Sequence, residues 1–218
     1  MLTTLRNKLS LLGALSLFAA LPFTAHAAAE RVTEGKLTYG TAATFRPFEF
    51  VKEGKLVGFD IDLITALSQK LNLQPVPLAM EFKVLILALQ GKRIDIINSA
   101  MYVNPTRASQ VDFVPYMKIG SLVVVKKGNP AAITGRDLSL CGKNIAVTLG
   151  GIEESQARAD NQRCLAEKHP AINVMTFPAA TDSAVAVALG RADAEFLSTP
   201  GTVALLSEKP GVFEATGK

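Results

Sequence analysis

Histidine is scarce in this sequence, which has only His26 and His169 among its 218 residues. His26 falls in the predicted signal peptide described below, so His169 is the one histidine of the exported chain. It lies near the predicted end of a helix, where an imidazole is an ordinary surface residue. The sequence therefore predicts neither a histidine-based metal site nor a Ser/His/Asp triad.

Long apolar runs are also missing, except near the N-terminus. Residues 9–23 are almost wholly apolar, follow Arg6 and Lys8, and precede the small-x-small pattern AHA at residues 25–27. These are the parts of a cleavable signal peptide, predicted here over residues 1–27. The run is shorter than the about 20 residues that span a bilayer. Since no cysteine stands at the cleavage point, we expect a freely soluble periplasmic protein without a lipid anchor.

Cysteine is limited to Cys141 and Cys164. In an oxidising compartment an even pair usually forms a disulfide, and closing a loop of this size contributes about 3 kcal/mol. Two free buried thiols are the alternative, which export disfavours.

Basic clusters are absent as well, although the pI is about 9.1. Lysine and arginine occur singly or in pairs, and aromatic residues make up only 6% of the chain. Removing Arg6 and Lys8 with the signal peptide lowers the net charge from +4 to +2. Nucleic-acid surfaces use dense basic patches with interleaved aromatic residues, so nucleic acid is excluded as a partner.

The rest of the chain alternates between apolar period 2 and period 3.6, which predicts an α/β fold. Strands are expected at residues 36–41, 74–78, 94–98, 120–127, 144–148, 172–176 and 192–197, with a hairpin tip at residues 53–55. Helices are expected at residues 60–71, 81–90, 152–168 and 181–189, after the Asn104-Pro105 cap, and from Ser198 or Thr199 to about residue 209. The pattern restarts after a break at residues 128–130. We therefore predict two lobes, residues 28–119 and residues 120–218, the second including a hinge strand.

Three stretches contain polar or glycine residues at strand–helix junctions. Residues 58–63 (GFDIDL) are by themselves only an acidic helix start. In residues 99–107 (SAMYVNPTR), Arg107 lies in a first helical turn, where a cation is disfavoured; a carboxylate clamp and an exposed surface ion pair explain it equally well. Residues 148–153 (TLGGIE) bring backbone N–H groups to a helix start. Neither dinucleotide-binding nor P-loop spacing is present, and no cofactor is predicted.

Together these stretches resemble the solute-binding proteins of polar amino-acid ABC transporters, bacterial extracellular family 3. The resemblance runs in order from about residue 37 to residue 208. It also includes residues 45–49 (FRPFE), 91–95 (GKRID), 111–113 (VDF) and 190–194 (GRADA). It implies the type II periplasmic binding fold, in which two α/β lobes close on a ligand in the cleft between them.

The resemblance also implies roles for individual residues. Phe45 and Phe82 correspond to aromatic residues that sandwich the ligand side chain, and Arg107 corresponds to the arginine that binds the α-carboxylate. Further contacts to that carboxylate are implied for Ala100, Tyr102, Gly151 and Ile152.

The expected acceptor of the ligand α-ammonium group is missing from this sequence. Ser198 stands where the family has an aspartate, and losing this charge-assisted hydrogen bond costs roughly 1.5–3 kcal/mol. Either Glu195, Glu153 or Glu49 supplies the charge from another direction, or the ligand is not an ordinary α-amino acid. Tyr102 and the pair Gly151-Ile152 likewise replace small hydroxyl residues.

The sequence also ends soon after the last predicted helix. Family members continue with a strand that returns to the first lobe and a helix that packs on it. We therefore expect a C-terminally truncated chain with an incomplete first lobe.

The function expected from the resemblance is that of a monomeric, non-enzymatic binding protein. It would capture an amino acid or a related small carboxylate-bearing solute and deliver it to the permease of an ABC importer. The alternative is a periplasmic dehydratase-like enzyme of the same fold that acts on a prephenate-type acid. Such an enzyme needs an acid or base in the cleft, and the spacing of the glutamates singles none of them out.

Overall fold

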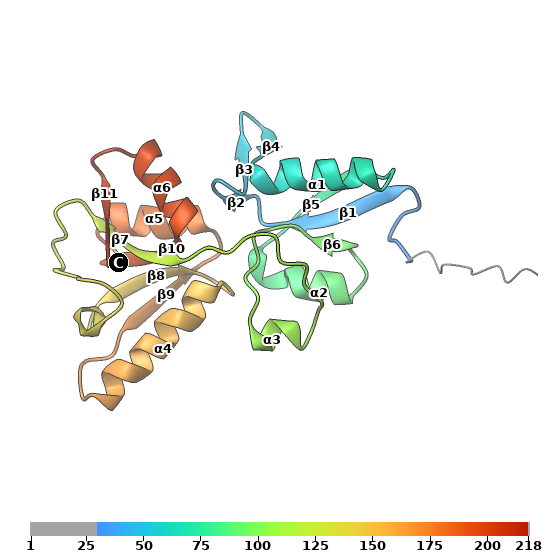
Figure 1. The fold of residues 1–218 in the computed structure, drawn as a ribbon. Coiled ribbons are helices and arrows are strands. Elements are labelled where there is room, and N and C mark those ends of the chain that lie inside the picture. Colours follow the sequence, from blue (N-terminus) through green and yellow to red (C-terminus); the bar gives the residue numbers. More distant parts are fainter. Residues whose placement is uncertain (1–29, 218) are drawn as a thin grey trace, which may run out of the picture. The chain divides into compact units, whose positions relative to one another are not determined.

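The computed structural model describes residues 30–217, so the signal-peptide prediction for residues 1–27 lies outside the described residues. The strands form three sheets. A three-stranded parallel sheet has the order β5-β1-β6, a mixed five-stranded sheet has the order β11-β7-β10-β8-β9, and a small antiparallel sheet has the order β2-β3-β4. The two larger sheets share no strand (Figure 1).

The first sheet is covered by a helix on each face (Figure 1). It contains β1 (Lys36–Thr41), β5 (Gln74–Ala79) and β6 (Ile96–Ile97). Alternate residues of β1 point to opposite faces, so Leu37 and Tyr39 pack with Ile64 of α1 (Phe59–Lys70). On the other face, a Cβ at Gly40 would lie 2.8 Å from Leu85 of α2 (Leu85–Gln90). Glycine at this position therefore allows α2 to pack directly on the strand.

The small sheet joins β1 to α1. It consists of β2 (Thr44–Phe45), β3 (Glu49–Lys52) and β4 (Lys55–Val57). Glu53 and Gly54 form its turn with φ values of 52° and 75°, which confirms the predicted hairpin tip. Gly58 has a φ of 127°, and a Cβ there would lie 2.8 Å from the carbonyl oxygen of Pro47 and would also collide with that of Phe48. Only glycine fits this entry to α1.

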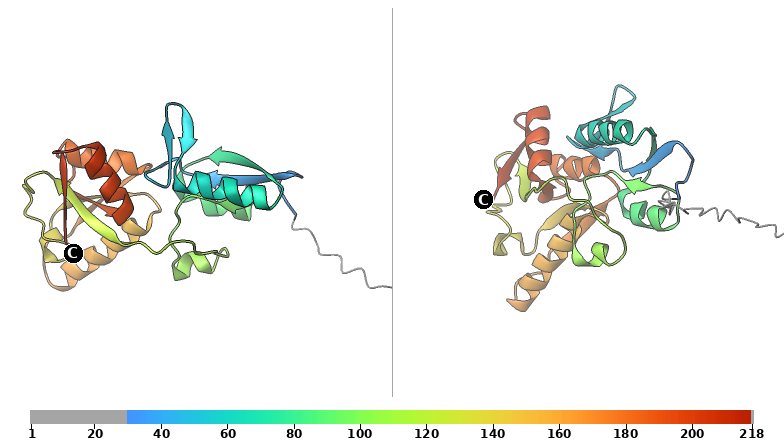
Figure 2. Two further views of the ribbon diagram at one scale, coloured as in Figure 1. Left: turned by 45° about the horizontal axis from the view of Figure 1, so that its top comes forward. Right: turned by 45° about the vertical axis from the view of Figure 1, so that its right-hand side comes forward.

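The second sheet contains β7 (Ser121–Lys126), β8 (Asn144–Thr148), β9 (Asn173–Phe177), β10 (Ala194–Ser198) and β11 (Phe213–Thr216). All five residues of β10 are buried because β7 and β8 flank it and helices cover both faces. On one face, Phe196 packs in a cluster with Ala157 and Cys164 of α4 (Ile152–Ala166). On the other, Leu197 packs with α5 (Ala180–Ala188) and α6 (Thr199–Glu208). Figure 2 shows these helices on opposite sides of the sheet.

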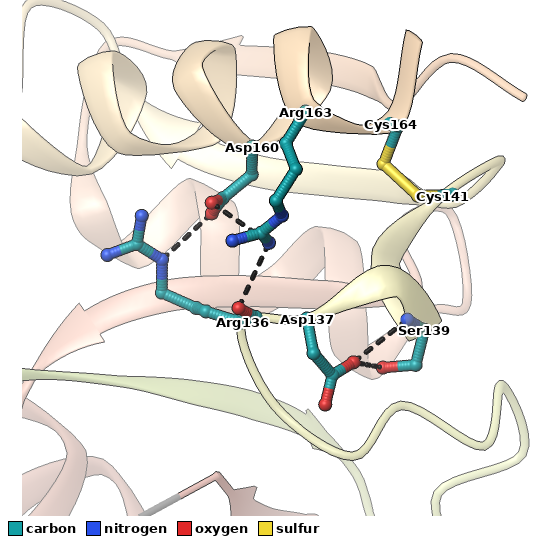
Figure 3. A network of polar contacts seen from close by, with 7 residues as sticks. All are labelled: Arg136, Asp137, Ser139, Cys141, Asp160, Arg163 and Cys164. Atoms are coloured by element: carbon teal, nitrogen blue, oxygen red, sulfur yellow. Dashed lines mark hydrogen bonds and ion pairs between the residues drawn. A yellow bond between two sulfur atoms is a disulfide. The ribbon is translucent and has the colours of Figure 1, made fainter. Parts of the chain in front are cut away.

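The disulfide predicted between Cys141 and Cys164 is confirmed, and it ties the end of the short 3-10 helix η2 (Leu138–Leu140) to α4. Figure 3 shows an ion-pair network beside it. Asp160 of α4 is 4% exposed and accepts from Arg136 at 2.8 Å, while Arg163 lies 3.2 Å from the same carboxylate. Arg163 also donates to the carbonyl oxygen of Arg136 at 3.0 Å. Covalent and ionic links therefore fix α4 to the loop that precedes β8.

The described elements depart from the expected ones in a few places. The helix expected at residues 81–90 begins as a 3-10 helix, η1 (Phe82–Val84), and becomes α-helical only at Leu85. The strand expected at residues 94–98 pairs with β1 over two residues only. The sequence predicts no strand after the last helix, but β11 forms there and pairs antiparallel with β7. Apolar periodicity missed β11 because it is four residues long.

Candidate ligand-binding site

Arg107 occupies a one-turn helix, α3 (Pro105–Ala108), that follows the first sheet. The predicted cap is confirmed, since the Asn104 side chain accepts from the Arg107 backbone N–H at 2.8 Å and Pro105 is the first helical residue. The guanidinium donates to the carbonyl oxygen of Tyr102 at 2.7 Å and to that of Gly150 at 2.7 Å. Gly150 follows β8 of the second sheet, so Arg107 links the chain after the first sheet to the loop after β8.

The Arg107 side chain is buried, and this burial lowers the pKa of its guanidinium from the usual value. Its charged group lies 5.5 Å from the centre of the Phe82 ring, within cation–π range. A guanidinium has five N–H donors, so one that donates to two carbonyl oxygens can also bind a carboxylate, whose charge would offset the cost of burying the cation.

A cavity of about 40 Å³ lies between these segments. It has room for about three water molecules. Six of the eight predicted ligand-binding residues line it: Phe45, Phe82, Ala100, Tyr102, Gly151 and Ile152. Arg107 lies beside it, in contact with Tyr102 and Phe82. Among these six predicted residues the largest separation in the sequence is 107 positions (Phe45 and Ile152), and the structure gathers them around one small space.

Ser198, the eighth predicted residue, is placed differently. It is fully buried, and its hydroxyl accepts from the backbone N–H of Gly201 at 3.1 Å, which caps α6. It does not line the cavity, although its neighbours Phe196 and Leu197 do. A hydroxyl engaged as a helix cap is poorly placed to take the role of a charged acceptor.

Gly150 and Gly151 of the predicted loop allow this loop to approach η1 closely. Gly150 has a φ of 78°, and a Cβ there would lie 3.0 Å from the Cβ of Lys83 in η1. Gly151 is the N-cap residue of α4, and its Cβ would lie 2.9 Å from the carbonyl oxygen of Thr148. The absence of side chains here is what lets the Gly150 carbonyl reach Arg107.

Asp60, expected from the sequence only as part of an acidic helix start, supports the backbone of the candidate site. It is fully buried; one carboxylate oxygen accepts from the Ala100 backbone N–H at 2.7 Å and the other accepts from the Tyr116 hydroxyl at 2.9 Å. Burial raises the pKa of Asp60, and these hydrogen bonds oppose the rise. Asp60 thereby fixes Ala100, whose φ of 41° is unusual for a residue with a side chain.

Of the three glutamates left open by the sequence, only Glu153 lines the cavity. It is 8% exposed, and its Oε1 has no hydrogen-bond partner within the described part of the chain. Burial raises the pKa of its carboxyl; its own backbone N–H and the charges of Arg107 and Arg136 act in the opposite direction. Burial, followed by the charge of Glu153, also raises the pKa of Tyr102 to about 12.

The other two glutamates lie elsewhere. Glu49 accepts from the Ser99 hydroxyl at 2.7 Å, and its pKa is raised well above the usual value by burial and by Asp60. Glu195 lies in β10 beneath the helices, and neither residue is part of the cavity lining.

A larger hollow of about 830 Å³ lies beside the first sheet. Its lining is mainly apolar and is formed by α1, β6 and the extended chain of residues 110–119. It shares Ala100 and Tyr102 with the small cavity, but it is lined by neither Arg107 nor any residue of the second sheet. The small cavity is therefore the better candidate, because charged and aromatic side chains from both halves of the described chain, such as Phe82 and Glu153, line it.

Comparison with known proteins identifies the family. The family model for bacterial extracellular solute-binding proteins, family 3, matches residues 37–203. The chain belongs to this family. Within residues 30–217 of this family 3 protein, no helix has the length and apolar character needed to cross a membrane. The same residues contain no group of His, Cys, Asp or Glu side chains placed to hold a metal ion.

Individual relatives are named as amino-acid-binding proteins. The arginine-binding extracellular protein ArtP of Bacillus subtilis (strain 168) is 35% identical over 123 residues, which are 56% of this chain and 48% of that protein. A probable histidine-binding protein of Campylobacter jejuni (strain ATCC 700819) is 38% identical over 135 residues, which are 62% and 52% of the two chains. The family 3 chain therefore spans about half the length of these two relatives.

Solved structures support the predicted type II periplasmic binding fold. An ancestral arginine-binding protein bound to arginine is 34% identical and has a TM-score of 0.78, with 84% of this chain and 79% of that chain covered. An ancestral amino acid-binding protein described as a precursor of cyclohexadienyl dehydratase is 31% identical with a TM-score of 0.74, covering 84% and 77%. The mixed α/β arrangement of this family 3 chain is shared with both.

Proposed function

We propose that this family 3 protein is the periplasmic substrate-binding component of an ABC importer. It binds an amino acid or a related carboxylate-bearing solute in the cavity beside Arg107 and delivers it to the permease. The proposal rests above all on the Arg107 guanidinium. It is buried and donates to the carbonyl oxygens of Tyr102, which follows the first sheet, and Gly150, which follows β8 of the second sheet. The names of the relatives as arginine- and histidine-binding proteins support the same class of ligand.

The geometry suggests how binding and closure are coupled. In this structure the Arg107 guanidinium, which follows the first sheet, donates one N–H group to the carbonyl oxygen of Gly150, which follows β8 of the second sheet. A ligand carboxylate would take over donors of the guanidinium. A cavity of about 40 Å³ must widen to admit an amino acid. Ligand therefore enters an open form and shifts the population towards a closed form.

Thermal denaturation with candidate ligands tests the proposal. The screen contains L-arginine, L-histidine, other amino acids and a prephenate-type acid, and each hit is followed by calorimetry. Ligand at a hundred times its dissociation constant stabilises a binding protein by about 2.7 kcal/mol. A hit that is recovered unchanged supports a binding protein. Conversion of the acid to a product supports the enzymatic alternative, and no stabilisation by any compound contradicts the proposal.

Arg107→Ala tests the clamp itself. Losing charge-assisted hydrogen bonds to a carboxylate should weaken binding by about 10- to 150-fold or more. Arg191→Ala is a matched control, since Arg191 is exposed and is not part of the cavity lining. Circular dichroism checks that both variants fold. Unchanged affinity in a folded Arg107→Ala variant would contradict the assignment of Arg107.

A further inference from the structure

Two side chains of opposite charge lie at or beside the candidate cavity. Arg107 approaches from the segment after the first sheet, and Glu153 approaches from the first turn of α4. The charge of Arg107 acts on the Glu153 carboxyl, and the charge of Glu153 acts on both Arg107 and Tyr102. Glu153 therefore lines the cavity, and the Arg107 guanidinium lies next to two of its lining residues, Tyr102 and Phe82.

We propose that Glu153 accepts the α-ammonium group of the ligand, so that the cavity selects zwitterionic α-amino acids over acids that lack this group. The proposal rests on the proposed function, because it takes the ligand carboxylate to be bound at Arg107. Glu153 fills the role that the serine at position 198 leaves open, and it does so from a different element, the start of α4 instead of the end of β10.

The state of the Glu153 side chain supports this role. The residue is more than nine-tenths buried, it lines the cavity, and its Oε1 has no hydrogen-bond partner within residues 30–217. An unpaired buried carboxylate oxygen is costly, so a cationic group placed beside it is strongly favoured. Glu49 is already bonded to Ser99, and Glu195 is not part of the lining, which leaves Glu153 as the acceptor.

The position of Glu153 relative to Arg107 points to the α-ammonium group instead of a distant side-chain cation. In an α-amino acid the carboxylate and the ammonium group are attached to the same carbon atom. Their two partners must therefore lie close enough to influence each other, as Arg107 and Glu153 do. A zwitterion placed between them puts each charge opposite its counter-charge and joins the two segments. The aromatic rings of Phe45 and Phe82 remain available for the ligand side chain.

The experiment compares ligands that differ only in the ammonium group. The probes are L-arginine and L-histidine together with their 2-hydroxy-acid analogues, argininic acid and imidazolelactic acid. Affinities are measured by calorimetry for the wild-type chain and for Glu153→Gln. We expect the substitution to weaken binding of the amino acids by about 10- to 150-fold, while the hydroxy acids change by less than about threefold. The wild-type preference for the ammonium-bearing ligand then disappears.

A pH series gives a second readout that a purely structural role would not produce. The ammonium group requires the ionised form of Glu153, so binding lowers the pKa of this carboxyl. Wild-type affinity for the amino acid relative to its hydroxy-acid analogue should fall as pH drops below the raised pKa of Glu153. In Glu153→Gln this ratio should stay constant with pH. Asp182→Asn, which removes an exposed acidic residue from the first turn of α5, is the matched control and should behave like the wild type.

The outcomes separate this inference from the proposed function. If the wild-type chain binds neither amino acid nor hydroxy acid, the proposed function fails and this inference fails with it. If the wild-type chain binds amino acids but Glu153→Gln loses both ligand types equally, or loses neither, only the role of Glu153 is overturned. Should Glu153→Gln fail to fold, Glu153→Asp replaces it. Its carboxylate keeps the charge but lies farther from the ligand, because the side chain is shorter, so the preference for the amino acid over the hydroxy acid should also fall.

Discussion

Glu195 lies at the second position of β10 with its side chain among apolar residues. It pairs with Val124 of β7 and Ala146 of β8, both of which belong to the core cluster beneath α5 and α6. It is 1% exposed, and neither carboxylate oxygen has a hydrogen-bond partner within the described residues. Burial, with a smaller contribution from the charge of Glu153, raises the pKa of Glu195 to about 8 from an ordinary value of 4.5.

This raised pKa gives a defined pH dependence of stability. The folded state keeps a proton on Glu195 that the unfolded chain releases above about pH 4.5, so the stability contribution is greatest at low pH. It is lost as pH rises towards the folded-state pKa of about 8. Each tenfold change in proton affinity is worth about 1.4 kcal/mol, so the total loss is about 5 kcal/mol, of which about 3 kcal/mol is already lost at pH 7.

Glu195→Gln should remove this dependence, because an amide of nearly the same shape carries no charge at any pH. Urea denaturation at pH 5, pH 7 and pH 9 measures it, followed by circular dichroism since the chain has no tryptophan. Glu49 and Asp60 also have raised pKa values and titrate in both proteins, so their effects cancel in the difference between variant and wild type. Glu153, whose charge acts on Glu195, adds only the smaller coupled contribution.

We expect the variant to lie within about 1 kcal/mol of the wild type at pH 5 and to be several kcal/mol more stable at pH 9. Glu167→Gln, at the exposed end of α4, should leave the pH profile unchanged. Parallel profiles of the wild type and Glu195→Gln would refute the reasoning, because they would mean that Glu195 is ionised in the folded protein at little cost.

Two further predictions concern stability. Replacing Cys141 and Cys164 together by serine opens a loop with a sequence separation of 23 and should lower the free energy of unfolding by about 3 kcal/mol, measured by urea denaturation; an unchanged midpoint would contradict this. Gly58→Ala places a Cβ against the carbonyl oxygens of Pro47 and Phe48 at a φ of 127°, so it should lower the free energy of unfolding by more than about 2 kcal/mol. Gly54→Ala is the control and should lower it by less, because nothing lies within 4 Å of the added Cβ. Equal losses in thermal denaturation would count against steric collision as the cause.

Local signals predicted most of the fold. The period switches located nearly all strands of the two larger sheets, and the Asn104-Pro105 pair predicted the cap of α3 because the cap is formed by adjacent residues. The disulfide also followed from the sequence, since only two cysteines exist to pair. Strand ends differ from the prediction where tertiary packing sets them. The strand predicted at residues 94–98 is only two residues long, because it pairs with β1 over two residues.

The sequence alone indicated the family and the residue types of the candidate site: an arginine, two phenylalanines and a glycine-rich helix start. It left Glu49, Glu153 and Glu195 equivalent, because each is a glutamate next to apolar residues. Only the tertiary structure separates them, placing Glu49 against Ser99, Glu195 inside the second sheet's core and Glu153 at the cavity beside Arg107. The physical reason is that burial and electrostatic neighbours depend on contacts between distant segments, such as Arg107 with Gly150, which no local pattern specifies.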